Sequence, residues 1–146
     1  MAFTKEYAAK VILSLDGVRQ TQRAQRNIYD SGIINPVSTS ALTNLLSYSS
    51  GILSLFLANT AAALAAGVLG LVASLTPSEK DVLQSMVYSG YWNLGYLEDF
   101  LVDNPGYDLI EINFPFIEYE TAGVRFITGK GVVTRVHSTS GGWVIL

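Results

Sequence analysis

The stretch ALTNLLSYSSGILSLFLANTAAALAAGVLGLVASL, residues 41–75, decides the fold expected of this chain. It lies inside a longer segment, residues 31–78, that contains no Asp, Glu, Lys, Arg or His. Leu, Ala and Phe dominate the stretch and no proline interrupts it, so the pattern predicts a helix over 40–75. That helix would be apolar nearly all round, which is typical of a helix buried in a protein core or in a membrane.

One face of this predicted helix carries small residues spaced by three or four. Small side chains at that spacing let the backbone of a second helix approach closely. We therefore predict that this face packs against another helix, either within the core or between subunits. Its residues are Ser47, Gly51, Ser54, Ala58, Ala62 and Ala65, and the pairs Ala63–Gly67 and Ala66–Gly70 repeat the spacing further on.

Two interpretations of the apolar stretch remain open. A single helix of this length would measure about 50 Å, whereas the hydrocarbon core of a bilayer is roughly 30 Å thick. The polar pair Asn59-Thr60 sits in the middle, where it marks either the tip of a helical hairpin or a polar position of one long helix. Serine is frequent in the first half, which favours a helix in protein over a helix in lipid.

The composition predicts one folded domain over 1–146, with a helical part at 1–103 and a β part at 107–146. Apolar residues make up 49% of the chain and charged residues 14%, so a disordered protein is excluded. The chain has no cysteine, which excludes disulfides, thiolate catalysis and cysteine-based zinc sites. Basic residues dominate the first thirty positions, and acidic residues dominate those after the apolar segment.

An amphipathic helix is predicted over 3–28. Apolar residues recur at every fourth position there, at Phe3, Tyr7, Val11 and Leu15. Three arginines of this segment fall on one helical face and are candidates for contact with an anion or an acidic partner, although such rows are more often simply solvated. They are Arg19, Arg23 and Arg26.

A third helix is predicted over 77–103, because Thr76, Pro77 and Glu79 form a capping box with proline at the first helical position. Four aromatic residues follow one another at intervals of four along it. We interpret this aromatic stripe as a contact surface for a sheet or a neighbouring subunit, and the acids nearby argue against nucleic acid. The stripe consists of Tyr88, Trp92, Tyr96 and Phe100.

After the turn at 103–106 the pattern changes to alternating apolar and polar residues. This alternation predicts a small antiparallel β-meander over about 108–146. Pro115 lies inside its first strand and indicates either a sheet edge or a bulge.

Motifs for catalysis are lacking. His137 is the single histidine, no G-x-S-x-G elbow occurs, and no acids pair closely in an apolar frame. A lone histidine without cysteine does not make a zinc site. We therefore expect no catalytic residue, no metal, no cofactor and no enzymatic activity.

Together these patterns predict an α+β protein with three helices, over about 3–28, 40–75 and 77–103, followed by the β-meander. The leading hypothesis is a non-enzymatic structural protein that assembles with copies of itself or with other subunits, such as a component of a virus or phage particle or of a filament. The alternative is a membrane-inserting or pore-like protein that uses 41–75 as its membrane segment. A third hypothesis is a module that binds a small ligand on the aromatic stripe.

Overall fold

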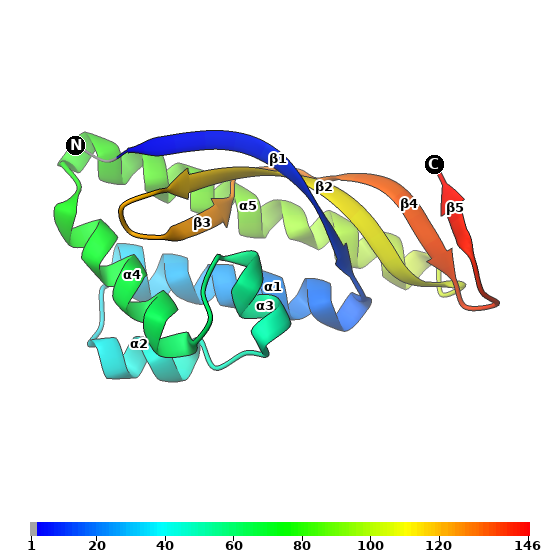
Figure 1. Ribbon diagram of the computed structural model, residues 1–146, viewed down its shortest axis with the longest axis horizontal. Coiled ribbons are helices and arrows are strands. Elements are labelled where there is room, and N and C mark those ends of the chain that lie inside the picture. Colours follow the sequence, from blue (N-terminus) through cyan, green and yellow to red (C-terminus); the bar gives the residue numbers. More distant parts are fainter. Residues whose placement is uncertain (1–2) are drawn as a thin grey trace.

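The chain is an α+β protein, as predicted, and its computed structural model describes residues 3–146 (Figure 1). A twisted antiparallel sheet lies over a layer of helices, and one continuous core of apolar side chains joins the two. The elements in chain order are β1 (Thr4–Leu13), α1 (Leu15–Ile28), the π-helical turn η1 (Tyr29–Ile34), α2 (Thr39–Leu45), α3 (Ser50–Leu55), α4 (Ala61–Ser74), α5 (Pro77–Asp103), β2 (Tyr107–Tyr119), β3 (Val124–Ile127), β4 (Val132–Ser138) and β5 (Trp143–Ile145).

Strand β2 is the centre of the sheet, so the predicted meander is wrong in its topology. Strand β1 pairs along one side of β2, from Thr4 opposite Tyr119 to Leu13 opposite Ile110. On the other side, β3 pairs with the second half of β2 and β4 pairs with the first half. Strand β5 then adds to β4 as an outer strand. Strands β3 and β4 therefore follow each other along one side of β2 instead of pairing with each other.

Pro115 explains why that side of β2 is shared by two strands. Proline has no N–H to donate, and Pro115 lies between the part of β2 that pairs with β3 and the part that pairs with β4. Its carbonyl oxygen still accepts a hydrogen bond from the Thr128 N–H at 3.0 Å. Neither alternative that Pro115 indicated is right, because β2 is a central strand and no edge, and the register shifts in its pairing with β4 lie before Pro115, between Tyr107 and Leu109 and between Glu111 and Ile112.

Residues 4–13 form β1, so the prediction of a helix over 3–28 is wrong in its first half. A spacing of four fits a helical face, but it also fits one face of a strand, because four is a multiple of two. Tyr7 and Val11 indeed lie on the same face of β1, opposite Phe116 and Ile112 of β2. The helix begins only after Ser14, whose hydroxyl oxygen accepts a hydrogen bond from the backbone N–H of Gly17 at 3.0 Å. The predicted division into a helical part at 1–103 and a β part at 107–146 is therefore also wrong at its start, because residues 4–13 belong to the sheet.

The central apolar stretch forms α2, α3 and α4, and neither one long helix nor a simple hairpin. Ser38 caps α2 and Thr60 caps α4, each through a hydrogen bond from a backbone N–H to its hydroxyl oxygen. Serine and threonine compete for backbone hydrogen bonds and so favour helix starts over helix interiors. Much of the stretch, including Leu42 and Leu64, is buried in the core of this one chain. Within residues 3–146, no helix combines the length and the apolar character needed to cross a membrane.

The turn between α3 and α4 places a leucine in the left-handed backbone region. Leu57 has a φ of 67° and its side chain is 42% exposed. A residue with a Cβ atom is less stable in this region by roughly 1 kcal/mol, because the Cβ atom crowds the backbone, whereas glycine has no Cβ atom and adopts the region freely. We expect Leu57→Gly to be about 1 kcal/mol more stable than Leu57→Ala, which removes the same contacts but keeps the Cβ atom. Urea denaturation of the two variants measures this difference, and equal stabilities would contradict the explanation by backbone strain.

Candidate functional site

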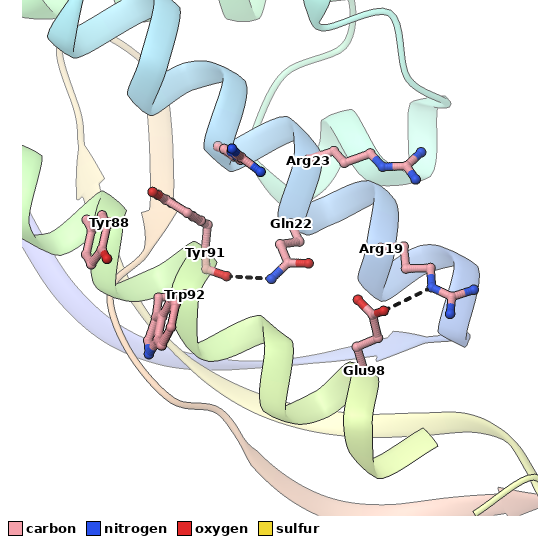
Figure 2. A pocket seen from close by; sticks show the side chains of 8 residues that line it. Arg19, Gln22, Arg23, Tyr88, Tyr91, Trp92 and Glu98 are labelled. Carbon is pink, nitrogen blue, oxygen red and sulfur yellow. Dashed lines mark hydrogen bonds and ion pairs between the residues drawn. The ribbon is translucent and has the colours of Figure 1, made fainter. Parts of the chain in front are cut away.

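A groove of about 480 Å³ runs between α1 and α5 (Figure 2). The two helices run antiparallel, because Arg19 of α1 lies beside Glu98 while Gln25 lies beside Val87. The groove brings together the arginines and part of the aromatic stripe that the sequence singles out separately. Its lining residues are Arg19, Gln22, Arg23, Arg26, Tyr88, Tyr91, Trp92 and Glu98.

Arg19, Arg23 and Arg26, which we call the arginine row, form one bank of the groove. They occupy exposed positions of α1, while the opposite side of this helix is buried. The Nε atom of Arg19 lies 3.3 Å from Glu98 Oε1, and that of Arg26 lies 3.6 Å from Asp30 Oδ2. Arg23 makes no ion pair with any of the described residues. Within residues 3–146, Arg23 is therefore the member of this row whose positive charge is not paired with a carboxylate.

Tyr88, Trp92 and Tyr96, which we call the aromatic row, stand on the exposed side of α5. Their exposed fractions are 45%, 59% and 52%, values that are high for such large side chains. Phe100, the fourth member of the predicted stripe, is half-buried and stacks on Tyr107 at a ring-centroid distance of 6.0 Å. The exposed part of the stripe therefore ends at Tyr96.

Tyr91 connects the two banks. Its ring lies 5.5 Å from that of Tyr29 and 5.2 Å from that of Tyr88, measured between centroids. Burial raises the pKa of Tyr91, and the nearby Asp30 carboxylate raises it further, so the hydroxyl stays protonated. The carbonyl oxygen of Tyr91 accepts a hydrogen bond from Gln22 Nε2 at 3.0 Å, which ties α1 to α5 at the floor of the groove (Figure 2).

The aromatic row continues into a second hollow, between α5 and the start of β4. Lys130 lies over the ring of Tyr96, with its Nζ atom 5.1 Å from the ring centroid. Val132 at the edge of this hollow is 65% exposed. The hollow is lined by Tyr96, Leu97, Phe100, Lys130, Gly131, Val132 and Val133. Tyr96 thus joins the exposed aromatic side chains to a further apolar surface.

The small residues of the central stretch do not share one helical face, which corrects that prediction. Ser47 lies between α2 and α3, Gly51 and Ser54 lie in α3, and Ala58 lies in the turn before α4. Ala62, Ala65, Gly67 and Gly70 belong to α4, but they differ in burial. Ala65 is fully buried. A Cβ atom on Gly67 would lie 2.8 Å from Val124 Cγ1, so this glycine allows α4 to pack on β3 within the same chain.

The sequence interpretation missed Gln25, which is fully buried under the groove. A signal existed, because Gln25 falls on the apolar side of α1 together with Val18 and Ile28. A polar side chain in that position needs hydrogen-bond partners, but the sequence does not say where they are. The structure supplies them from α5 and β3.

Titratable side chains also meet on the sheet, away from the groove. Glu111 Oε2 lies 2.9 Å from Arg135 Nη2, and this contact lowers the pKa of Glu111. His137 Nδ1 lies 2.6 Å from Asp108 Oδ1, and this hydrogen bond lowers the pKa of Asp108. Within residues 3–146, no three side chains of His, Cys, Asp or Glu lie close enough together to hold a metal ion. These contacts fasten β2 to β4.

The comparisons with known proteins give no match. No protein-family model matches the chain, and neither a curated protein nor a solved structure matches it. The geometry and the chemistry of this chain therefore carry the functional proposal.

Proposed function

We propose that the chain is a non-enzymatic subunit that assembles with copies of itself, as subunits of virus particles or filaments do, and that the α1–α5 surface makes the contact. The observation that carries this proposal is the aromatic row. Three large aromatic side chains, each about half exposed, stand on successive turns of one helix. Exposed aromatic clusters of this kind are typical of protein–protein contacts, and Trp, Tyr and Arg are the residues that dominate binding energy there.

The proposed contact surface combines two of the candidate surfaces that the sequence indicates, the aromatic stripe and the three arginines. The third candidate, the small-residue face of the central stretch, has less support, because α2, α3 and α4 bury many of their apolar side chains in the core of their own chain. The α1–α5 surface leaves its aromatic side chains exposed and adds the arginine row beside them. Membrane insertion through 41–75 has less support, because the stretch is divided among three short helices.

Light scattering of the purified chain tests this proposal. We expect discrete species heavier than the 15.8 kDa chain. Trp92→Ser should shift them toward the single chain, with an association at least about tenfold weaker, because a central aromatic residue of a contact commonly contributes 2 kcal/mol or more.

Val102→Ser is the matched control, because Val102 is also exposed on α5, at 52%, and lies outside the aromatic row. It should associate like the unmodified chain. A single 15.8 kDa species at every concentration of the unmodified chain would overturn the proposal, and so would equal effects of Trp92→Ser and Val102→Ser.

A further inference from the structure

We propose that the aromatic row of one copy is covered by the arginine row of a second copy, in a dimer whose two-fold axis runs between α1 and α5 and parallel to them. This inference rests on the proposed function, since it names the surface that covers the aromatic row. The charges of the two helices, the symmetry of the contact and the spacing of the two rows support this dimer.

The two helices carry opposite charges on the same side of the molecule. Helix α1 holds three arginines and one aspartate, whereas α5 holds one lysine and five carboxylates. The aromatic row is flanked by exposed acids, with Asp81 before it and Asp99 and Asp103 after it. A small hollow lined partly by Trp92, Tyr96 and Asp99 shows that the acid at position 99 adjoins the row. Each copy thus presents one basic bank and one acidic, aromatic bank.

A two-fold axis can bring this surface against the same surface of a second copy in two ways, with the axis perpendicular or parallel to the helices. The charges of the helices decide between them. An axis perpendicular to the helices would put α1 on α1 and α5 on α5, so that arginines face arginines and acids face acids. An axis parallel to the helices puts α1 of each copy on α5 of the other, so that opposite charges meet twice. Like charges that face each other disfavour a contact, and opposite charges favour it. The two-fold axis parallel to α1 and α5 is therefore the favoured one.

The spacing of the two rows fits this arrangement. The Arg19–Glu98 ion pair and the Gln22–Tyr91 hydrogen bond show which turns of α1 and α5 lie at the same level (Figure 2). An axis parallel to the helices preserves these levels. The arginine row spans about 10.5 Å and the aromatic row about 12 Å at the helical rise of 1.5 Å per residue, so the two have nearly the same length.

The contacts that result are of a kind that this chain already makes internally. Arg23 of one copy comes to the level of Trp92 of the other, and Arg19 comes to the level of Asp99. A guanidinium group stacks favourably on an aromatic ring. Within the chain, the guanidinium carbon of Arg135 lies 4.2 Å from the ring centroid of Trp143, and that of Arg125 lies 3.9 Å from the ring centroid of Phe116.

A charge-exchange experiment tests the pairing by sedimentation velocity. Arg19→Glu and Asp99→Arg are each expected to weaken dimerisation at least about tenfold, because the two-fold axis repeats every change. An equimolar mixture of the two variants should dimerise nearly as well as the unmodified chain, since the mixed dimer contains one native pair and one reversed pair. Lys5→Glu makes the same change of charge on β1 and should have no effect.

Arg23→Gln is a second variant that breaks no ion pair among the described residues and so leaves the folded chain intact. It should weaken dimerisation about tenfold or less, by the loss of two stacked guanidinium groups. If the charge variants associate like the unmodified chain while Trp92→Ser does not, the two-fold pairing is overturned and the proposed function stands. If both exchange variants fail to associate and their mixture fails as well, the pairing is also overturned. An unmodified chain that never associates would overturn both.

Discussion

Gly90→Ala is expected to lower the free energy of unfolding by about 3 kcal/mol or more, or to prevent folding, because its new methyl group has no space. A Cβ atom at Gly90 would overlap the carbonyl oxygen of Ile127 and the Nε2 atom of Gln25, and it would lie 2.7 Å from the carbonyl carbon of Ile127. The backbone of α5 therefore packs directly on the edge of β3 that faces away from β2. Overpacking against a backbone carbonyl forces the helix and the strand apart, which costs at least as much as ordinary core overpacking of 1–3 kcal/mol.

Gly95→Ala in the same helix is the matched control. A Cβ atom there would meet only Gln22 Nε2, at an ordinary distance of 3.6 Å. Alanine is a better helix former than glycine, so Gly95→Ala should be neutral or stabilising by up to about 1 kcal/mol. Urea denaturation followed by circular dichroism measures both variants. Similar stabilities of the two variants would contradict the close contact between α5 and β3.

Gln25→Met is expected to lower the free energy of unfolding by about 3 kcal/mol, because Gln25 joins three elements in the core. Its Oε1 atom accepts a hydrogen bond from the Ile127 N–H at 3.1 Å, and its Nε2 atom donates to the Ile127 carbonyl oxygen at 2.7 Å. The same Nε2 atom donates to the carbonyl oxygen of Val87 at 3.1 Å. Methionine has a similar shape but removes the hydrogen-bond partner of the buried Ile127 N–H and carbonyl groups, and each such loss costs about 1–3 kcal/mol.

Gln22→Met tests whether burial is the reason for the large loss of stability expected in Gln25→Met. Gln22 sits one turn away on α1 and makes a hydrogen bond to a single backbone carbonyl, but its side chain is partly exposed, so water can replace that contact. We expect a loss below about 1 kcal/mol for this control. A loss in Gln25→Met no larger than that in Gln22→Met, in the same denaturation experiment, would show that the buried bridge contributes little.

These two buried residues also hold the proposed contact surface in place. Gln25 lies on the inner side of the helix that carries the arginine row, and Gly90 lies on the inner side of the helix that carries the aromatic row. Together they fix α1, α5 and β3 at one separation. The spacing between the two rows is thus set by the core and does not depend on the exposed side chains.

The sequence predicts the elements whose signals are local. The capping box at Thr76 and Glu79 is present and starts α5, which ends at Asp103 as predicted. The buried face of this helix includes Leu83, Val87 and Leu94, in agreement with the apolar spacing. The strands after the turn at 103–106 also lie where the alternation places them. Each of these features depends on residues that are close together in the sequence.

The features that the sequence interpretation missed depend on distant partners. Strand β1 pairs with β2 more than ninety residues later, and its spacing of apolar residues suits a helix equally well. The division of the central stretch depends on tertiary packing, because its leucines and alanines favour a helix throughout. The arginine row and the aromatic row were each found from their spacing, but their meeting in one groove depends on the antiparallel packing of α1 on α5.

Acrylamide quenching of Trp92 fluorescence at increasing protein concentration tests whether the α1–α5 surface is covered when the chain associates. The chain has two tryptophans, and Trp143→Phe leaves Trp92 as the only one. Trp92 is 59% exposed in the single chain, so it should be readily quenched in dilute solution. We expect quenching to fall as the chain associates, because association covers the aromatic row. Association that leaves Trp92 as quenchable as in the dilute chain would contradict the assignment of the α1–α5 surface as the contact.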